Sequence, residues 1–247
     1  MALKITINYS PSFSPKKRVF KKIKFIIFHY TGMKNESDAI SKLTEIQSEV
    51  SSHYLIKNNG EIIKMVPDLY IAWHAGESSW KNYKSLNQNS IGIEITNPGH
   101  EYGYKKFSQK QITSLLKLSK FLIKKYKISS KNILGHSDIA VLRKKDPGEK
   151  FPWEYLSKNK IGIWHTLNKQ DLIKNRKLKI SREEENFFFS NLFKIGYSKK
   201  IPSEISKIKY LKELVKTFQR RFRQELVDGK IDHECLLISK NLIKTYN

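Results

Sequence analysis

The amino-acid sequence predicts an α/β domain, in which helices flank a mixed β-sheet, followed by a small all-α domain of three helices. In the first part of the chain, short apolar runs typical of buried strands alternate with segments of helical spacing. After Trp164 the chain becomes polar and lysine-rich and loses this periodicity, and the segments that follow have helical spacing alone. We therefore predict a first domain over residues 1–160, a linker over 161–180 and a helical domain over 181–247.

Strands are predicted where a short apolar or aromatic run meets turn residues. The sequence Asn58-Asn59-Gly60 favours a hairpin between two of them, and Asn97-Pro98-Gly99 ends another. The predicted strands cover residues 24–30 (KFIIFHY), 53–57, 61–66, 90–96 (SIGIEIT) and 133–135.

Helices are predicted where apolar residues recur every three or four positions. The clearest covers residues 108–126, with Ser108 as its N-cap and Gln111 at the capping-box position. A shorter helix is predicted over residues 35–50. The three helices of the second domain are predicted at residues 182–195, 205–223 and 232–246.

A formal net charge of +24 and an isoelectric point near 9.9 stand out in a chain of 247 residues. Such a charge could bind nucleic acid, an anionic membrane surface or an acidic substrate. However, the positive residues are mostly lysines spread along the whole chain, which favours a solvated surface that reflects codon composition. No Cys-x-x-Cys pair, RNA-binding aromatic motif or recognition helix accompanies them. We therefore expect no nucleic-acid partner.

The single cysteine, Cys235, excludes an internal disulfide and a cysteine-rich metal site. The first residues lack the apolar run of a secretory signal, and no lipobox-like cysteine lies near them. The longest early apolar stretch, Phe25 to Phe28, is far too short to cross a membrane. For the sequence as written we expect no transmembrane segment and a cytoplasmic protein, with a periplasmic or envelope-associated location as the alternative.

Two of the seven histidines occupy settings typical of a metal site, although a single histidine is more often a surface or satisfied core residue. His29 ends an apolar strand, whose rigid backbone would direct the imidazole into a cleft at the sheet edge. His136 follows another short strand, and Asp146 precedes a Pro-Gly turn further along the chain. Two imidazoles and one carboxylate, with a fourth position left for water, form the pattern of a catalytic zinc site.

Glu94 and Lys144 each allow two interpretations. Glu94 interrupts an apolar strand, so it either faces solvent by simple alternation or points into the cleft as a general base beside a metal-bound water. Lys144 lies in the run Arg143-Lys144-Lys145, which is ordinarily a solvated charged surface. Beside a metal, its ammonium group could instead stabilise the oxyanion that forms on an amide carbonyl.

Aromatic residues could line a groove for sugars and peptides, although core packing is the more frequent role of tryptophan. Trp73, His74 and Trp80 lie between the predicted hairpin and the strand that carries Glu94. Tyr30 and Tyr54 are candidates on the same grounds. We expect these five residues to contact a substrate.

Taken together, six short motifs resemble the type 2 N-acetylmuramoyl-L-alanine amidases, relatives of the phage lysozyme-type amidases and the peptidoglycan recognition proteins. They follow the family's order and spacing across essentially all of residues 1–160. The motifs are FHYTG (28–32), VSSHYLIKNNGEI (50–62), AWHAGESSW (72–80), SIGIEITNPG (90–99), GHSDIA (135–140) and KKDPGEKFPW (144–153). The segment TFQRRFRQELVDGKID (217–232), with helical sequence on both sides, is similar to the small peptidoglycan-binding helical module that follows some of these amidases.

The resemblance implies a type 2 amidase-like fold and one zinc ion per chain, held by His29, His136 and Asp146. It implies that Glu94 is the acid/base residue and that Lys144 stabilises the tetrahedral intermediate. The implied reaction cuts the amide bond between N-acetylmuramic or anhydro-N-acetylmuramic acid and L-alanine, in peptidoglycan or in muropeptides, during cell-wall turnover or recycling. We expect a monomer with a peptidoglycan or muropeptide substrate.

The alternative is a recognition protein that binds peptidoglycan without cutting it. Non-catalytic relatives typically lose a metal ligand, commonly the third, whereas Asp146 is present here together with Glu94 and Lys144. The chain also departs from family members with two domains, which are often exported, because it shows no export signal.

Overall fold

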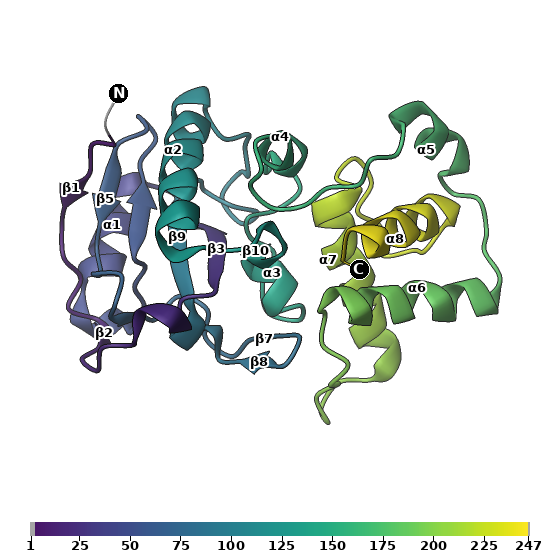
Figure 1. Ribbon diagram of the computed structural model, residues 1–247, viewed down its shortest axis with the longest axis horizontal. Helices are drawn as coiled ribbons and strands as arrows, with labels where there is room; N and C mark the ends of the chain where they lie inside the picture. The colour runs from purple at the N-terminus through teal and green to yellow at the C-terminus, as the bar shows by residue number, and fades with distance from the viewer. Residues whose placement is uncertain (1–2, 247) are drawn as a thin grey trace.

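The computed structural model describes residues 3–246 and has a sheet domain followed by a group of helices (Figure 1). Six strands form the main sheet in the order β1-β5-β4-β9-β3-β10. Strands β4 and β5 pair antiparallel and the other neighbours pair parallel, so the sheet is mixed, as predicted. The six strands are β1 (Thr6–Ile7), β3 (Phe25–Tyr30), β4 (Tyr54–Ile56), β5 (Ile62–Lys64), β9 (Ser90–Ile95) and β10 (Ile133–Gly135). Two small antiparallel pairs join β2 (Phe13–Ser14) to β6 (Ile71–Ala72) and β7 (Ser79–Trp80) to β8 (Tyr83–Lys84).

The observed helices begin close to the predicted starts, but the helix predicted over residues 35–50 is shorter: α1 ends at Thr44 and a separate 3-10 turn follows at Ile46–Ser48. Ser108 caps α2 with the expected capping box: the Gln111 backbone N–H donates to the Ser108 hydroxyl, and the Ser108 N–H donates to the Gln111 side chain. The α-helices are α1 (Glu36–Thr44), α2 (Gln109–Tyr126), α3 (His136–Ile139), α4 (Trp153–Lys158), α5 (Lys169–Asn175), α6 (Arg182–Ile195), α7 (Lys207–Phe222) and α8 (His233–Tyr246). Short 3-10 helices lie at Phe20–Lys22, Ile46–Ser48, Leu86–Asn89 and Ser130–Asn132.

Different helices pack against the two faces of the sheet. Ile26 and Phe28 of β3 lie on the face that α2 and α4 cover. Phe25 and Ile27 lie on the opposite face, which we call the site face because His29 continues the same alternation. Helix α1 covers the β4–β5 end of the site face through Leu43, and the C-terminal helices cover the β3–β10 end. The carboxyl ends of β3 and β9 lie between α1 and the C-terminal helices.

The C-terminal helices share a hydrophobic core with the sheet. Phe188 of α6 and Phe218 of α7 belong to one buried cluster with Phe25 and Ile27 of β3. The segment predicted as a linker also contains a helix, α5, whose Leu172 is buried in the same cluster. A seven-residue helix with one buried residue leaves no visible period in the sequence, which is why the prediction missed it.

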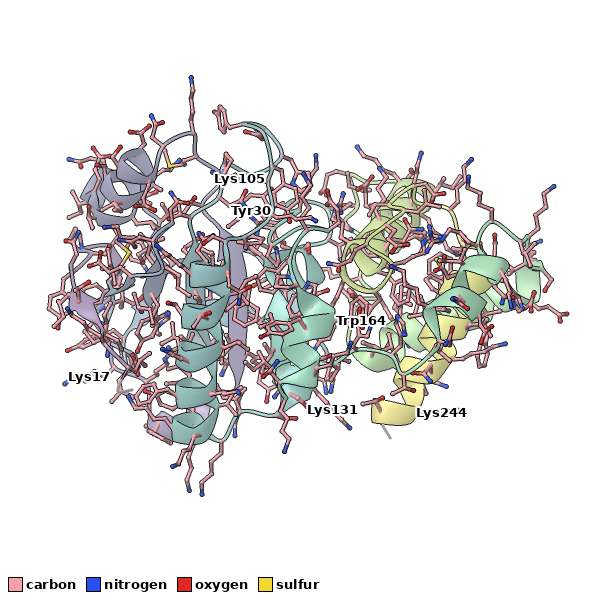
Figure 2. All side chains as sticks on the ribbon, turned by 90° about the horizontal axis from the view of Figure 1, so that it is seen from above. Lys17, Tyr30, Lys105, Lys131, Trp164 and Lys244 are labelled. Carbon is pink, nitrogen blue, oxygen red and sulfur yellow. The ribbon has the colours of Figure 1, made fainter. Side chains whose placement is uncertain are left out.

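The charged side chains extend from both parts of the molecule. Lys17, Lys131 and Lys244 lie on the periphery of the molecule, whereas Trp164 lies at the junction of the sheet domain and the helices (Figure 2). Trp164 packs against the core clusters on both sides of this junction. Within residues 3–246, no helix has the length and apolar character that crossing a bilayer requires.

One buried ion pair ties α7 to the sheet domain. The Arg221 guanidinium donates to the Asp138 carboxylate and to the Ile133 carbonyl oxygen (3.0 Å), and it lies 4.3 Å from the centre of the Trp153 ring. Asp138 also accepts the Gly135 N–H at 2.8 Å and the Tyr197 hydroxyl at 2.8 Å. Both charged side chains are almost completely buried, at 3% and 1% exposure. A helix remote in sequence therefore holds the segment that begins with His136.

We expect Arg221→Met to lower the free energy of unfolding by about 3–5 kcal/mol, because it leaves the Asp138 carboxylate buried without its cation. Urea unfolding followed by circular dichroism measures this difference. Lys158→Met is the matched control: it breaks the Lys158–Glu154 pair, whose side chains are 70% and 53% exposed, and should cost less than about 1 kcal/mol. Equal losses in the two variants would contradict the structural role of the buried pair.

Candidate metal centre

The register of β3 and β9 brings the first two candidate residues together. His29 pairs with Glu94 across the two parallel strands, so both side chains project from the site face at the carboxyl ends of their strands. His136 begins α3 directly after β10, the other neighbour of β3. The Ser137 N–H donates to the Asp146 carbonyl oxygen at 2.8 Å, which holds the Asp146 segment against the start of α3. Three separate segments therefore converge at one point.

The candidate ligand atoms form a close triangle. His29 Nδ1 lies 2.9 Å from His136 Nδ1, and Asp146 Oδ2 lies 3.1 Å from each of these nitrogens. All three residues are buried, at 1%, 4% and 6% exposure respectively. This geometry can hold a metal ion. Two imidazole nitrogens and one carboxylate oxygen also leave a fourth position of a tetrahedral site for water or substrate.

The electrostatics of the triangle suit a cation. Burial, together with His136, lowers the pKa of His29 to about 4, so this imidazole is neutral at pH 7 and its Nδ1 can offer a lone pair. Although burial opposes ionisation of Asp146, His136 and His29 hold the pKa of its carboxyl below its usual range. Two histidine rings and one carboxylate anion are ligands of the kind that zinc binds in catalytic sites.

Glu94 lies beside this triangle. Its carboxylate Oε1 is 4.0 Å from His29 Nδ1, its side chain is 14% exposed, and its Oε2 has no hydrogen-bond partner among the described residues. Burial, followed by the negative charge of Asp146, raises the pKa of Glu94 to about 8. As strand alternation predicts, Glu94 faces away from the core that contains Ile93. The space that its side chain faces is the pocket, as the alternative interpretation expects.

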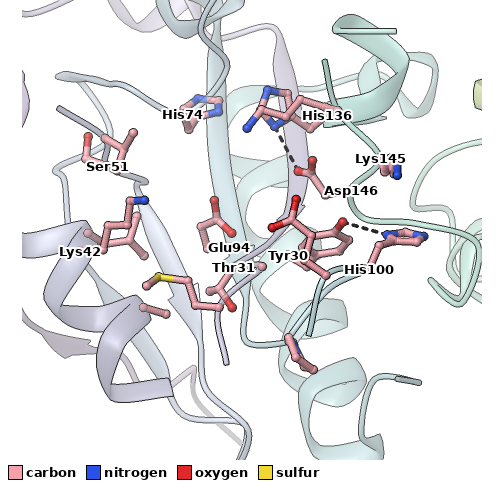
Figure 3. A pocket seen from close by; sticks show the side chains of 18 of the residues that line it. Tyr30, Thr31, Lys42, Ser51, His74, Glu94, His100, His136, Lys145 and Asp146 are labelled. Carbon is pink, nitrogen blue, oxygen red and sulfur yellow. Dashed lines mark hydrogen bonds and ion pairs between the residues drawn. The ribbon is translucent and has the colours of Figure 1, made fainter. Parts of the chain in front are cut away.

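A cavity of about 390 Å³ opens in front of these residues (Figure 3). Lys42 and Ser51 form one wall, and Tyr30 and Lys145 lie on the opposite side of Glu94. Basic residues at the rim suit an anionic ligand. The full lining is Tyr30, Thr31, Gly32, Met33, Ala39, Lys42, Leu43, Val50, Ser51, Trp73, His74, Glu94, Pro98, His100, Glu101, His136, Arg143, Lys144, Lys145 and Asp146.

Three of the five predicted substrate contacts line the pocket, namely Tyr30, Trp73 and His74. Sequence reasoning missed His100, whose Nδ1 lies 2.9 Å from the Tyr30 hydroxyl and whose Nε2 lies 3.0 Å from the Glu149 carboxylate. Its position after the Asn97-Pro98-Gly99 turn that ends the Glu94 strand was the available signal, since turns at the carboxyl ends of strands border such sites.

The structure places the other two predicted contacts, Tyr54 and Trp80, away from the cavity. Tyr54 is completely buried on the opposite face of the sheet, and its hydroxyl donates to Asp68 at 2.6 Å. Trp80 is 1% exposed and packs edge-on against Tyr197 in the core shared with the C-terminal helices. Both residues stabilise the fold, and neither reaches the cavity.

Both the sequence and the fold are similar to known amidases. Residues 19–149 match the family described as N-acetylmuramoyl-L-alanine amidase. The chain is 33% identical over 242 residues to N-acetylmuramoyl-L-alanine amidase AmiD of Escherichia coli, an alignment that covers 92% of this chain and 84% of AmiD. It is 41% identical over 113 residues to 1,6-anhydro-N-acetylmuramyl-L-alanine amidase AmpD of Haemophilus influenzae, covering 45% of this chain and 59% of AmpD.

The solved structures extend this likeness to the C-terminal helices. AmiD of Escherichia coli, in complex with the substrate anhydro-N-acetylmuramic acid-L-Ala-D-gamma-Glu-L-Lys, aligns with a TM-score of 0.79 at 31% identity, covering 94% of this chain and 93% of that one. AmpDH3 of Pseudomonas aeruginosa aligns with a TM-score of 0.78 at 30% identity and covers 98% of each chain. The complex of AmpDH3 with an anhydromuramic pentapeptide aligns with a TM-score of 0.77.

In the metal-free protein we expect the Glu94 carboxyl to titrate near pH 8, because burial and Asp146 disfavour its charged form. From the ordinary value of 4.5 up to about 8, the folded protein holds this proton while the unfolded chain has lost it, so this group's contribution to stability falls as the pH rises. Carbon-13 NMR of the carboxyl measures the pKa, and Glu94→Gln should remove this part of the pH dependence. Titration near pH 4 would contradict the burial of this carboxyl beside Asp146.

Proposed function

Because the chain belongs to the N-acetylmuramoyl-L-alanine amidase family, we propose that it hydrolyses the amide bond between N-acetylmuramic or anhydro-N-acetylmuramic acid and L-alanine, with one zinc ion held by His29, His136 and Asp146. The observation that carries this proposal is the triangle of donor atoms with separations of 2.9–3.1 Å beside a protonatable carboxyl. The zinc ion and the residue roles are the parts of the proposal that experiments must test.

Zinc, when bound, polarises an amide carbonyl and lowers the pKa of water to ~7. Glu94 is placed to take the proton of the attacking water and to return it to the amine of L-alanine as that amine leaves. A carboxyl group in this position can serve in both steps, because it can accept a proton as the carboxylate and donate it again as the acid. Since the Oε2 atom has no hydrogen-bond partner within residues 3–246, one oxygen of this carboxyl is available for the exchange.

Lys144 is the proposed oxyanion partner. Its side chain is half-buried at the pocket, and its positive charge is close enough to lower the pKa values of both Glu94 and His29. An ammonium group in this place stabilises the negative charge that develops on the carbonyl oxygen as the water attacks.

The proposed substrate is a muropeptide. AmiD and AmpDH3 bind anhydromuramic peptides, and the rim of the present pocket carries Lys42, Arg143 and Lys145, which suit the carboxylates of a peptide stem. We propose that the C-terminal helices bind peptidoglycan in addition to packing on the sheet. Binding without cleavage is the rival function, and the presence of a third donor, Asp146, together with Glu94 argues against it.

Digestion of purified muropeptides, with and without a chelator, tests the proposal by mass spectrometry. We expect release of a free L-alanyl peptide, its loss with chelator and its return with one equivalent of zinc. Soluble anhydro-muropeptides and insoluble sacculi, offered in parallel, separate a recycling role from a role in wall turnover. Intact substrate in the presence of stoichiometric zinc would contradict hydrolysis and support the binding-only alternative.

Glu94→Gln should keep zinc bound and slow hydrolysis by roughly 10² or more, because the amide cannot accept the proton of the attacking water. Steady-state rates and the zinc content of the same sample check both parts. Glu101→Gln is the matched control, since Glu101 also lines the pocket but should leave the rate nearly unchanged. Loss of zinc from the Glu94 variant would instead assign this carboxyl to the metal.

Lys144→Met should lower kcat by roughly 10² with little change in zinc content, because one donor to the oxyanion is lost. The neighbouring Lys145→Met is the matched control: Lys145 is more exposed and should affect KM rather than kcat. Equal effects of the two substitutions on kcat would show that only the general positive charge of the rim matters.

A further inference from the structure

We propose that the dipeptide His74-Ala75, in the connection between β6 and β7, forms the outer shell of the metal site and fixes the tautomers of both imidazole ligands. The proposal rests on the zinc site proposed above and goes beyond it. It assigns His74 as a positioning residue that acts through His29, although His74 was predicted from the sequence to contact substrate.

The first half of this shell is a hydrogen-bond chain whose direction is set by a carbonyl group. The Ser90 hydroxyl donates to the Leu86 carbonyl oxygen at 2.6 Å, and a carbonyl can only accept. Because its one hydrogen is used there, Ser90 must accept from His74 Nε2, which lies 3.1 Å away. A neutral His74 then has a lone pair on Nδ1, and it accepts from His29 Nε2 at 3.0 Å.

The consequence for His29 is a fixed tautomer. With its proton on Nε2, His29 has its lone pair on Nδ1, the atom that faces His136 and Asp146. The Leu86 carbonyl group therefore sets the direction of each hydrogen bond in the series, through the side chains of Ser90 and His74, as far as His29. A hydrogen bond from the second nitrogen of a ligand imidazole is also the device that orients such ligands and raises their basicity.

The second half of the shell acts on His136 in the same way. His136 Nε2 lies 3.2 Å from the Ala75 carbonyl oxygen, which can only accept, so this nitrogen carries a proton, and in the neutral ring the lone pair is then on Nδ1. Arg143 also donates to the Ala75 carbonyl oxygen, at 3.0 Å. Adjacent residues therefore set the tautomers of the two histidine ligands.

The dipeptide is itself held in place. The Asn87 side-chain oxygen accepts the N–H groups of both His74 (3.1 Å) and Ala75 (2.7 Å). The His74 ring packs directly over Gly92, where an added Cβ would come within 2.4 Å of the ring carbon Cγ. Ser90, Gly92 and Glu94 lie on the same face of β9, so one strand supplies the end of the hydrogen-bond chain, the space for the ring and the proposed acid/base residue.

The test measures zinc affinity, by competition with a chromophoric chelator, in His74→Leu, His74→Asn, Gly92→Ala and the wild type. We expect His74→Leu and Gly92→Ala to weaken zinc binding by roughly 10- to 100-fold, as loss of an outer-shell partner does elsewhere. His74→Asn should recover part of this loss, because its side-chain oxygen can still accept from His29 Nε2. His233→Leu is the matched control, since His233 contacts Asn175 in the C-terminal helices.

A second readout, nitrogen-15 NMR of the histidine rings, reports the tautomer directly. We expect a protonated Nε2 on His29 and His136 in the zinc-bound wild type, with the His29 signal altered in His74→Leu and the His136 signal retained. Wild-type zinc affinity in both His74→Leu and Gly92→Ala would overturn the proposed shell, as would a His29 ring without a proton on Nε2 in the zinc-bound wild type. Failure of the wild type to bind zinc would instead overturn the proposed function.

Discussion

The convergence of two imidazole nitrogens and a carboxylate oxygen, separated by 2.9–3.1 Å, is the constraint on which the rest of this structure depends. When the second nitrogens of His29 and His136 carry the protons, three electron-rich atoms face one another in a buried space. Their repulsion is relieved only by an added proton or by a cation. The fold maintains this arrangement by taking the three residues from different rigid segments: the end of β3, the start of α3 and the turn that follows.

The C-terminal helices help to hold the three donor atoms in place. Arg221 of α7 neutralises Asp138, which lies in the same short helix as His136, and hydrophobic packing joins α6 and α7 to the site face of the sheet. A module that the sequence suggests as a separate binding domain is therefore also part of the support of the metal centre. If these helices bind peptidoglycan, as proposed, they would hold it on a part of the protein that packs directly against the sheet carrying the active site.

The sequence predicted those features that local chemistry specifies. The apolar runs gave the central strands, the capping box gave the start of α2, and the order of six motifs gave the family, which the comparisons confirm. The meeting of His29, His136 and Asp146 at one point agrees with the expectation that the family resemblance gave.

Features that depend on tertiary packing were not accessible in the same way. Tyr54 and Trp80 lie in motifs that look like binding motifs, yet the pleat sends Tyr54 to the other face and the C-terminal helices bury Trp80. The outer role of His74 depends on the direction of a hydrogen-bond chain that ends on a backbone carbonyl, which no sequence pattern encodes. The raised pKa of Glu94 likewise follows from burial beside Asp146, a contact between residues distant in the chain.

Anomalous diffraction at the zinc edge, from crystals of the full chain loaded with one equivalent of zinc, tests the central claim most directly. We predict one strong peak at about 2.0–2.2 Å from His29 Nδ1, His136 Nδ1 and an Asp146 carboxylate oxygen, with water in the fourth position. A peak located elsewhere, or coordination through the Nε2 atoms of the two histidines, would contradict it.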